Sequence, residues 1–262
     1  MLDQVKVSII IPVFNGENHI ENCVNAIINQ DFKKNYEIIF INDASTDNSL
    51  EIIKEYRIPN LKVFSLSSNS GQSAARNLGI GKASGEYIFF MDVDDMIEKN
   101  TLSILFNEAM EKNYDFVCSD FKRIENLVNQ RKNTYNYPEN KEFNHEEIIS
   151  AMHNELHDPT LGHLGLFGCN GRLIRRSILI QNNILFEEKL RWLEDKTFCW
   201  DVLSHVKSAK YIRQQLYSYF VYPEVHTAVI ESLLRGFPLD YIKLIVQHIR
   251  AALKRMNLSN DQ

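Results

Sequence analysis

Blocks of apolar and polar positions alternate along the first 120 residues. Continuous apolar runs, such as VSIIIPV and YEIIFIN, are typical of strands that are buried on both faces of a sheet. Between these runs Ile20, Val24 and Ile27 recur at the three- or four-residue spacing of a helix. The pattern predicts strands at 5–14, 36–43, 61–66, 85–93 and 115–121, and helices at 17–29, 45–56, 70–84 and 100–113. This alternation predicts an α/β fold with a mostly parallel sheet, right-handed crossovers and flanking helices.

The periodicity weakens after residue 121. Residues 122–144 are rich in Asn and Lys, and we expect a mobile loop or lid there. Asn144 and Glu147 have capping-box spacing at the start of a predicted helix. Helices are predicted at 144–156, 172–183, 192–206 and 227–256, the last with a break at 236–238, and one or two strands at 209–222. We therefore expect an α/β half at 1–121, a second half of the same domain at 122–225, and a helical tail at 226–262.

Composition narrows the functional classes. The chain has 262 residues, 44% of them apolar, and a formal net charge of -5, which gives no indication of nucleic-acid binding. The four cysteines include no C-x-x-C pair, so we expect reduced core thiols and a cytoplasmic protein. We find neither a basic leader nor an apolar run of membrane-spanning length.

Polar clusters follow four of the predicted strands. These clusters are PVFNGE, NDASTD, SNSGQSAARN and DVDD. In parallel α/β sheets ligands bind beyond the carboxyl ends of the strands. The four clusters therefore predict one binding site at that edge of the sheet.

The DVDD cluster places Asp92, Asp94 and Asp95 within four positions. Carboxylates this close repel one another unless a cation lies among them. Mn²⁺ or Mg²⁺ accepts such oxygen ligands and completes its coordination with water and substrate phosphates. The alternative is an acidic turn in which Asp95 caps the helix that begins near Glu98.

Two further residues extend this site. Asp43, at the end of the second strand, can accept a hydrogen bond from an imide N–H such as that of uracil. Arg76, on the helix after the third strand, can neutralise a diphosphate. The alternatives are that Asp43 only starts a turn and that Arg76 is an ordinary surface residue.

Together the motifs resemble the family 2 glycosyltransferases, which have the GT-A fold of nucleotide-diphospho-sugar transferases. The likeness rests on VSIIIPVFNGENHIENCVNAIINQDF, YEIIFINDASTDNS, NSGQSAARNLGIGKASGEYIFFMDVDD and ILFEEKLRWLEDKTF. It is close over residues 5–97 and looser over about 165–205. It implies an inverting transferase that moves a sugar from a nucleoside-diphosphate donor, with UDP expected, to a glycan or lipid-linked acceptor.

The resemblance also implies roles for individual residues. Nucleotide-binding residues would be Pro12, Val13, Asn15, Glu17, Asp43, Arg76 and Asp92. Asp94 would bind Mn²⁺ or Mg²⁺, and Asp195 would be the general base. Glu194 and Trp192 would lie on the acceptor side. From the residues alone, the favoured interpretation of Glu194 and Asp195 is the acidic first turn of a helix.

Several alternatives stay open. A nucleotidyltransferase would carry a Gly-rich, arginine-containing loop after the first strand, and PVFNGENH lacks it. A non-catalytic nucleotide-sugar-binding protein of the same fold is the other alternative. His226 is interpreted as a surface residue, with contact to the diphosphate or metal as the alternative, and His163 is open in the same way. The basic, amphipathic tail at 241–256 is expected to pack on the core, with peripheral contact to an anionic membrane as the alternative.

Overall fold

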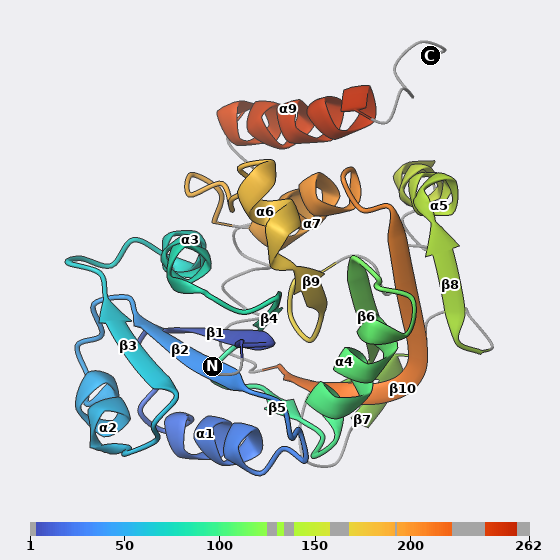
Figure 1. Ribbon diagram of the computed structural model, residues 1–262. Coiled ribbons are helices and arrows are strands. Elements are labelled where there is room, and N and C mark those ends of the chain that lie inside the picture. The colour runs from blue at the N-terminus through green and yellow to red at the C-terminus, as the bar shows by residue number, and fades with distance from the viewer. Residues whose placement is uncertain are drawn as a thin grey trace.

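The computed structural model describes residues 4–124, 130–133, 139–157, 168–191, 193–221 and 239–255. Within these ranges one sheet runs through the molecule in the order β3-β2-β1-β4-β9-β6-β10-β5, with β7 beside β6 and β8 beside β10. Helices α1 and α2 lie on one side of the first strands and α3 lies on the other (Figure 1).

The strands and helices have these bounds. The strands are β1 (Val7–Val13), β2 (Tyr36–Asn42), β3 (Leu61–Ser65), β4 (Tyr87–Phe90), β5 (Met96–Ile97), β6 (Phe116–Ile124), β7 (Gln130–Asn133), β8 (Lys141–Asn144), β9 (Leu173–Arg175) and β10 (Ser208–Phe220). The helices are α1 (Ile20–Ile28), α2 (Ser49–Glu55), α3 (Gln72–Lys82), α4 (Thr101–Glu111), α5 (His145–His157), α6 (Arg176–Gln181), α7 (Glu194–Leu203) and α9 (Leu239–Arg255).

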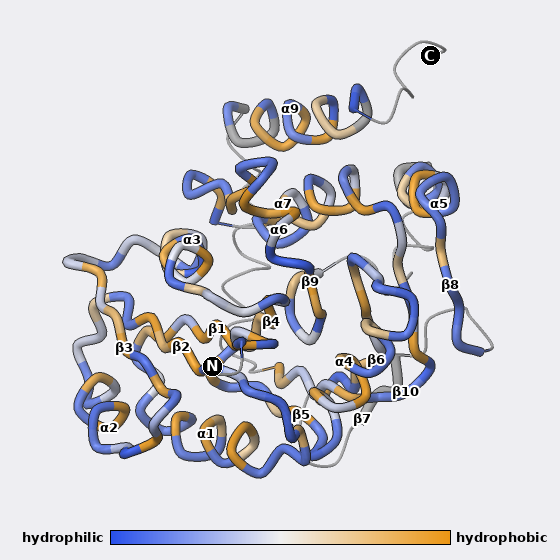
Figure 2. Tube along the Cα trace, viewed as in Figure 1, coloured by the Kyte–Doolittle hydropathy of each residue, from blue (hydrophilic) through white to orange (hydrophobic). Residues whose placement is uncertain are grey.

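The first half confirms the predicted parallel sheet. β1 pairs in parallel with β2 and with β4, and β2 pairs in parallel with β3. Every residue of β1 is buried, with Ile10 in the core on one face and Ile9 and Ile11 in the core on the other. Burial on both faces explains why the strand is a continuous apolar run. Figure 2 shows apolar residues along the central strands and on α7, and on other helices such as α1 and α9.

The second half corrects two predictions. Residues 172–183 do not form one helix, because β9 comes first and pairs antiparallel with both β4 and β6. Three residues are too few to reveal a strand period, so the apolar run looked helical. The expected loop at 122–144 contains the end of β6 and, in its described parts, β7 and β8. Their polar residues hid these strands, which are held by backbone pairing to β6 and β10.

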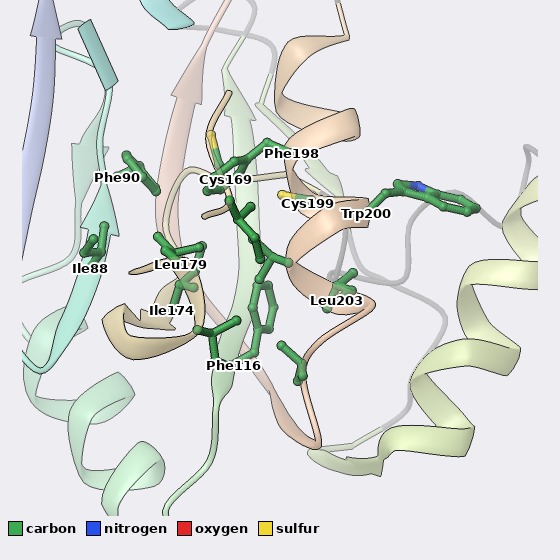
Figure 3. Packing of buried hydrophobic residues seen from close by; sticks show 14 of the residues in the cluster. Ile88, Phe90, Phe116, Cys169, Ile174, Leu179, Phe198, Cys199, Trp200 and Leu203 are labelled. Atoms are coloured by element: carbon green, nitrogen blue, oxygen red, sulfur yellow. The ribbon is translucent and has the colours of Figure 1, made fainter. Parts of the chain in front are cut away.

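Aromatic packing joins the two halves above the sheet. The Phe90 ring at the end of β4 meets the Phe198 ring of α7 edge-on, with ring centroids 5.7 Å apart. Phe186 stacks on Phe198 with centroids 3.8 Å apart. Figure 3 shows Phe90 and Phe198 within the cluster of buried residues that also holds Cys169 and Cys199. The segment before α7 is thereby fixed against the carboxyl end of β4.

The tail forms α9, which packs against α7. Ala252 is fully buried and Ile249 packs against the core, as expected of a core-packing helix. The predicted break at 236–238 lies outside the described residues, and the membrane-contact alternative stays a prediction. In the described ranges no helix combines the length and apolar character that crossing a membrane requires.

A buried carboxylate fixes the edge of the sheet opposite the strands' carboxyl ends. Glu37 Oε1 accepts hydrogen bonds from Ser8 Oγ at 2.6 Å and from Ser84 N at 2.7 Å. Its Oε2 pairs with Lys62 Nζ at 2.6 Å. Burial alone would raise the pKa of Glu37, but these hydrogen bonds lower it below the ordinary value. Glu37 therefore stabilises the fold in its ionised form.

Glu37→Gln is expected to lower the free energy of unfolding by about 1–3 kcal/mol, because buried donors lose a charged acceptor. The pKa of Glu37 is lower in the native state than in the unfolded chain. The stabilisation by ionised Glu37 is therefore present above the unfolded pKa and is lost as the pH falls through the native pKa. Urea unfolding between neutral pH and pH 3 measures both effects. Glu86→Gln, at a more exposed pair with Lys6, is the control; equal losses in the two variants would contradict the assignment.

Candidate functional site

A cavity of about 630 Å³ lies at the carboxyl edge of the sheet. Its walls come from the segments that follow β1, β2, β3 and β4, together with the segment before α7. Predicted site residues that line it are Pro12, Val13, Asn15, Asp43, Asp92, Asp94 and Glu194. All four polar clusters therefore meet at one place, as the strand order predicts.

Asn15 and Glu17 tie the first two loops of the site together. Asn15 has a positive φ of 51°, and its Oδ1 accepts a hydrogen bond from Thr46 N at 2.8 Å. Glu17 Oε2 accepts a hydrogen bond from Asn48 N at 3.0 Å. Glu17 is not among the lining residues, so it supports the cavity wall from behind.

Asp43 fixes the loop between β3 and α3. Its side chain is buried, with Oδ1 accepting from Ser70 N at 2.7 Å and Oδ2 accepting from Gly71 N at 2.8 Å. Each carboxylate oxygen keeps a further lone pair. Asp43 can therefore hold this loop and still accept a hydrogen bond from a ligand in the cavity.

Arg76 is buried rather than exposed, which overturns the interpretation as a surface residue. Its Nη2 donates to Asp92 Oδ1 at 2.8 Å, and its Nη1 lies 3.5 Å from Glu194 Oε1. The guanidinium carbon is 5.3 Å from the centroid of the Phe186 ring. Asp92 Oδ2 accepts from Asn170 Nδ2 at 2.7 Å. Arg76 lies behind the lining and fixes carboxylates from both halves of the chain.

Asp95 binds β10 and does not cap a helix. Its Oδ2 accepts from Tyr217 Oη at 2.5 Å and its Oδ1 accepts from Phe220 N at 3.0 Å. The Tyr217 ring packs over Gly171, where φ is +68° and an added Cβ would lie 2.7 Å from the ring. Helix α4 begins only at Thr101. The suggested capping role of Asp95 is therefore wrong.

Asp94 remains as the member of the DVDD cluster that can meet a cation. It lines the cavity, and burial and the neighbouring Asp92 raise its pKa above the ordinary value. Both oxygens of Asp92 already accept hydrogen bonds. In the described part of the chain no three His, Cys, Asp or Glu side chains are grouped to enclose a metal. One carboxylate fits a Mn²⁺ or Mg²⁺ ion that takes its other ligands from water and substrate phosphates.

Glu194 and Asp195 open α7 directly after Leu193, which has a positive φ of 62°. Glu194 lines the cavity, and burial and the charge of Asp195 raise its pKa to about 7, against the lowering effect of Arg76. Asp195 is half-buried, its Oδ1 accepts from Lys196 N at 2.7 Å, and it is not among the lining residues. Trp192 lies outside the described residues, as do His163 and His226.

The cavity also has lining residues that the sequence analysis did not single out. Phe14 is 48% exposed beside it, and His19, Ser73 and Arg191 contribute to its walls. Phe14 stands inside the PVFNGE motif, and its position in this predicted site loop was the available signal. Asn170 had no such signal, because its contact with Asp92 depends on the placement of β9.

Comparison with known proteins gives a consistent result. The profile described as Glycosyl transferase family 2 matches residues 8–182. The cholesterol galactosyltransferase of Borreliella burgdorferi is 28% identical over 269 residues, covering 100% of this chain and 71% of that protein. The poly(ribitol-phosphate) beta-N-acetylglucosaminyltransferase TarS of Staphylococcus aureus is 30% identical over 219 residues, covering 82% of this chain.

A solved structure agrees over nearly the whole chain. The crystal structure of S. aureus TarS 1-349 in complex with UDP superposes with a TM-score of 0.69 at 26% identity, covering 96% of this chain and 71% of that one. The match spans only 35% of full-length TarS.

Glu194→Gln is expected to change how stability depends on pH. The native pKa of about 7 exceeds the ordinary value, so the native state binds the extra proton between the two values. The contribution of this proton to the free energy of unfolding is fully present below the pKa of Glu194 in the unfolded chain. It is lost as the pH rises through about 7. The variant should therefore gain stability over the parent between pH 5 and 8, by on the order of 3 kcal/mol.

Urea unfolding across this pH range measures the difference. Glu111→Gln, an exposed carboxylate on α4, is the control and should show a constant difference from the parent. A Glu194→Gln difference that does not grow with pH would show that Glu194 is ionised throughout.

Proposed function

The chain belongs to glycosyl transferase family 2, and from this premise we propose that it transfers a sugar from a nucleoside-diphosphate donor to an acceptor hydroxyl group. The observation that carries the proposal is that Asp43, Asp94 and Glu194 line one and the same cavity. Asp43, which we expect to read the base, and Asp94, which we expect to hold a cation, line the same space as the start of α7. We expect a UDP-sugar as donor and a glycan or lipid-linked saccharide as acceptor.

The donor would lie along the carboxyl ends of β1, β2 and β4. Asp43 would accept the imide N–H of the base, while Pro12 and Val13 form the adjacent wall. Asp92, held by Arg76 and Asn170, would orient the ribose. Mn²⁺ or Mg²⁺ at Asp94 would supply positive charge to the diphosphate as it leaves.

The acceptor would approach from the α7 side. A carboxylate oxygen of Asp195 takes the proton of the acceptor hydroxyl group while the hydroxyl oxygen attacks the anomeric carbon of the donor sugar. The bond from that carbon to the diphosphate oxygen breaks at the same time, so one displacement inverts the anomeric configuration. Asp195 must turn toward the cavity for this step, and its place in the first turn of α7 leaves it half-exposed to do so.

The cysteines support the compartment that we propose. All four are free thiols and all are buried. We infer that the protein works in the reducing environment of the cytoplasm. An acceptor linked to a lipid would then be met at the inner face of a membrane.

Asp195→Asn is expected to lower sugar transfer by roughly 10²–10⁴-fold, the usual contribution of a positioned general base, while nucleotide binding is unchanged. Asp94→Ala should instead lose the metal dependence of nucleotide binding. Release of UDP from a panel of UDP-sugars, with glycan and lipid-linked acceptors, measures transfer.

Asp31→Asn, an exposed carboxylate elsewhere on the surface, is the control. Transfer by Asp195→Asn at the parent rate would remove Asp195 from the role of base. Nucleotide binding without transfer in every parent assay would favour the non-catalytic alternative.

A further inference from the structure

One corner of the cavity is rich in hydrogen-bond donors. The helix α3 begins there after Gly71, which has a φ of 92° and gives the helix no side-chain cap. The amides of the first turn, Gln72 to Ala74, have no acceptor within the helix because no residue precedes them by four positions in it. Such a helix end attracts anions.

Ser73 adds a second, independent feature to this corner. It lines the cavity, and its side chain is 3% exposed. Its Oγ has no hydrogen-bond partner among the described residues. A buried hydroxyl without a partner is costly unless a ligand or water completes it.

Arg191 brings a positive charge to the same corner from the segment before α7. It lines the cavity and is exposed, and its Nη1 would lie 3.2 Å from a Cβ placed on Gly71. In the described ranges no carboxylate lies within ion-pair distance of Arg191. Its guanidinium is therefore directed at the start of α3 without a charge partner.

The nearby carboxylates have partners other than Arg191 and the amides of Gln72 to Ala74. Asp43 accepts the amides of Ser70 and Gly71, so the open amides begin at the next residue. Glu188 Oε1 accepts from Asn77 Nδ2 at 3.0 Å, and Glu194 faces Arg76. The donors of this corner therefore keep their capacity for a ligand that enters the cavity.

We propose that Arg191, Ser73 and the first turn of α3 form a subsite for an oxyanion, a phosphate or carboxylate group carried by a substrate. The subsite lies in the same cavity as Asp94, which offers the opposite charge. It rests on the proposed function only for the identity of the molecule that carries the anion. That molecule is either the acceptor, which would approach along the segment before α7, or the donor.

Inorganic phosphate without metal is the probe, compared with sodium chloride at equal ionic strength by thermal unfolding. Phosphate is expected to raise the melting temperature of the parent. Arg191→Gln should weaken phosphate binding by about tenfold or more, the effect of losing a charge-assisted hydrogen bond. Ser73→Ala should weaken it in the same direction by a smaller factor.

Lys189→Gln is the matched control, because it removes one positive charge from the same segment without touching the cavity. It should respond to phosphate as the parent does. The subsite is refuted by a parent that does not respond, by an Arg191→Gln variant that responds fully, or by an equal loss in Lys189→Gln.

Repeating the titration with saturating UDP and Mn²⁺ identifies the source of the anion. A phosphate response that persists assigns the subsite to the acceptor, and a response that disappears assigns it to the phosphates of the donor. If UDP and Mn²⁺ do not stabilise the parent while phosphate still acts through Arg191, the proposed function fails and the subsite stands. If UDP and Mn²⁺ stabilise the parent while phosphate has no effect through Arg191, the subsite is refuted and the proposed function stands.

Discussion

The buried ion pair between Arg76 and Asp92 is the interaction on which the site depends. Removing one partner of such a pair leaves an uncompensated charge in the interior, at a typical cost of 3–5 kcal/mol. Arg76 on α3 also faces Glu194 at the start of α7, and Asp92 after β4 accepts a hydrogen bond from Asn170 just before β9. The pair therefore connects α3, the end of β4, the start of β9 and the start of α7. These charged contacts stabilise the shape of the cavity, because separating Arg76 from its carboxylate partners would cost considerable free energy.

The same network explains how three aspartates share four positions. Asp92 is neutralised by Arg76, and Asp95 is turned away from the cavity and bonded to Tyr217. Asp94 alone of the three is left facing the cavity without an ion-pair partner in the described ranges. Part of the positive charge that the DVDD motif requires therefore comes from the protein itself, from Arg76. Asp94 is the carboxylate of the motif that is left to face a bound cation.

The first half could be predicted from the sequence because its signals are local. Apolar runs such as VSIIIPV fix the strands, and their carboxyl ends place Asp43 and Asp94 at one edge. The second half depends on non-local pairing. β9 is three residues long and β7 is polar throughout, so neither shows the apolar–polar alternation that identifies a strand. The burial of Arg76 could not be foreseen either, since it requires Phe186 and Glu194, more than 100 residues away, to close over it.

The central claim is that this cavity binds a nucleoside diphosphate with a divalent cation. Isothermal titration of the parent with UDP, GDP, dTDP and CDP, each with and without Mn²⁺, tests it most directly. We expect UDP to bind, and to bind more tightly with Mn²⁺ than without. Absence of binding by all four nucleotides in the presence of Mn²⁺ would contradict the account.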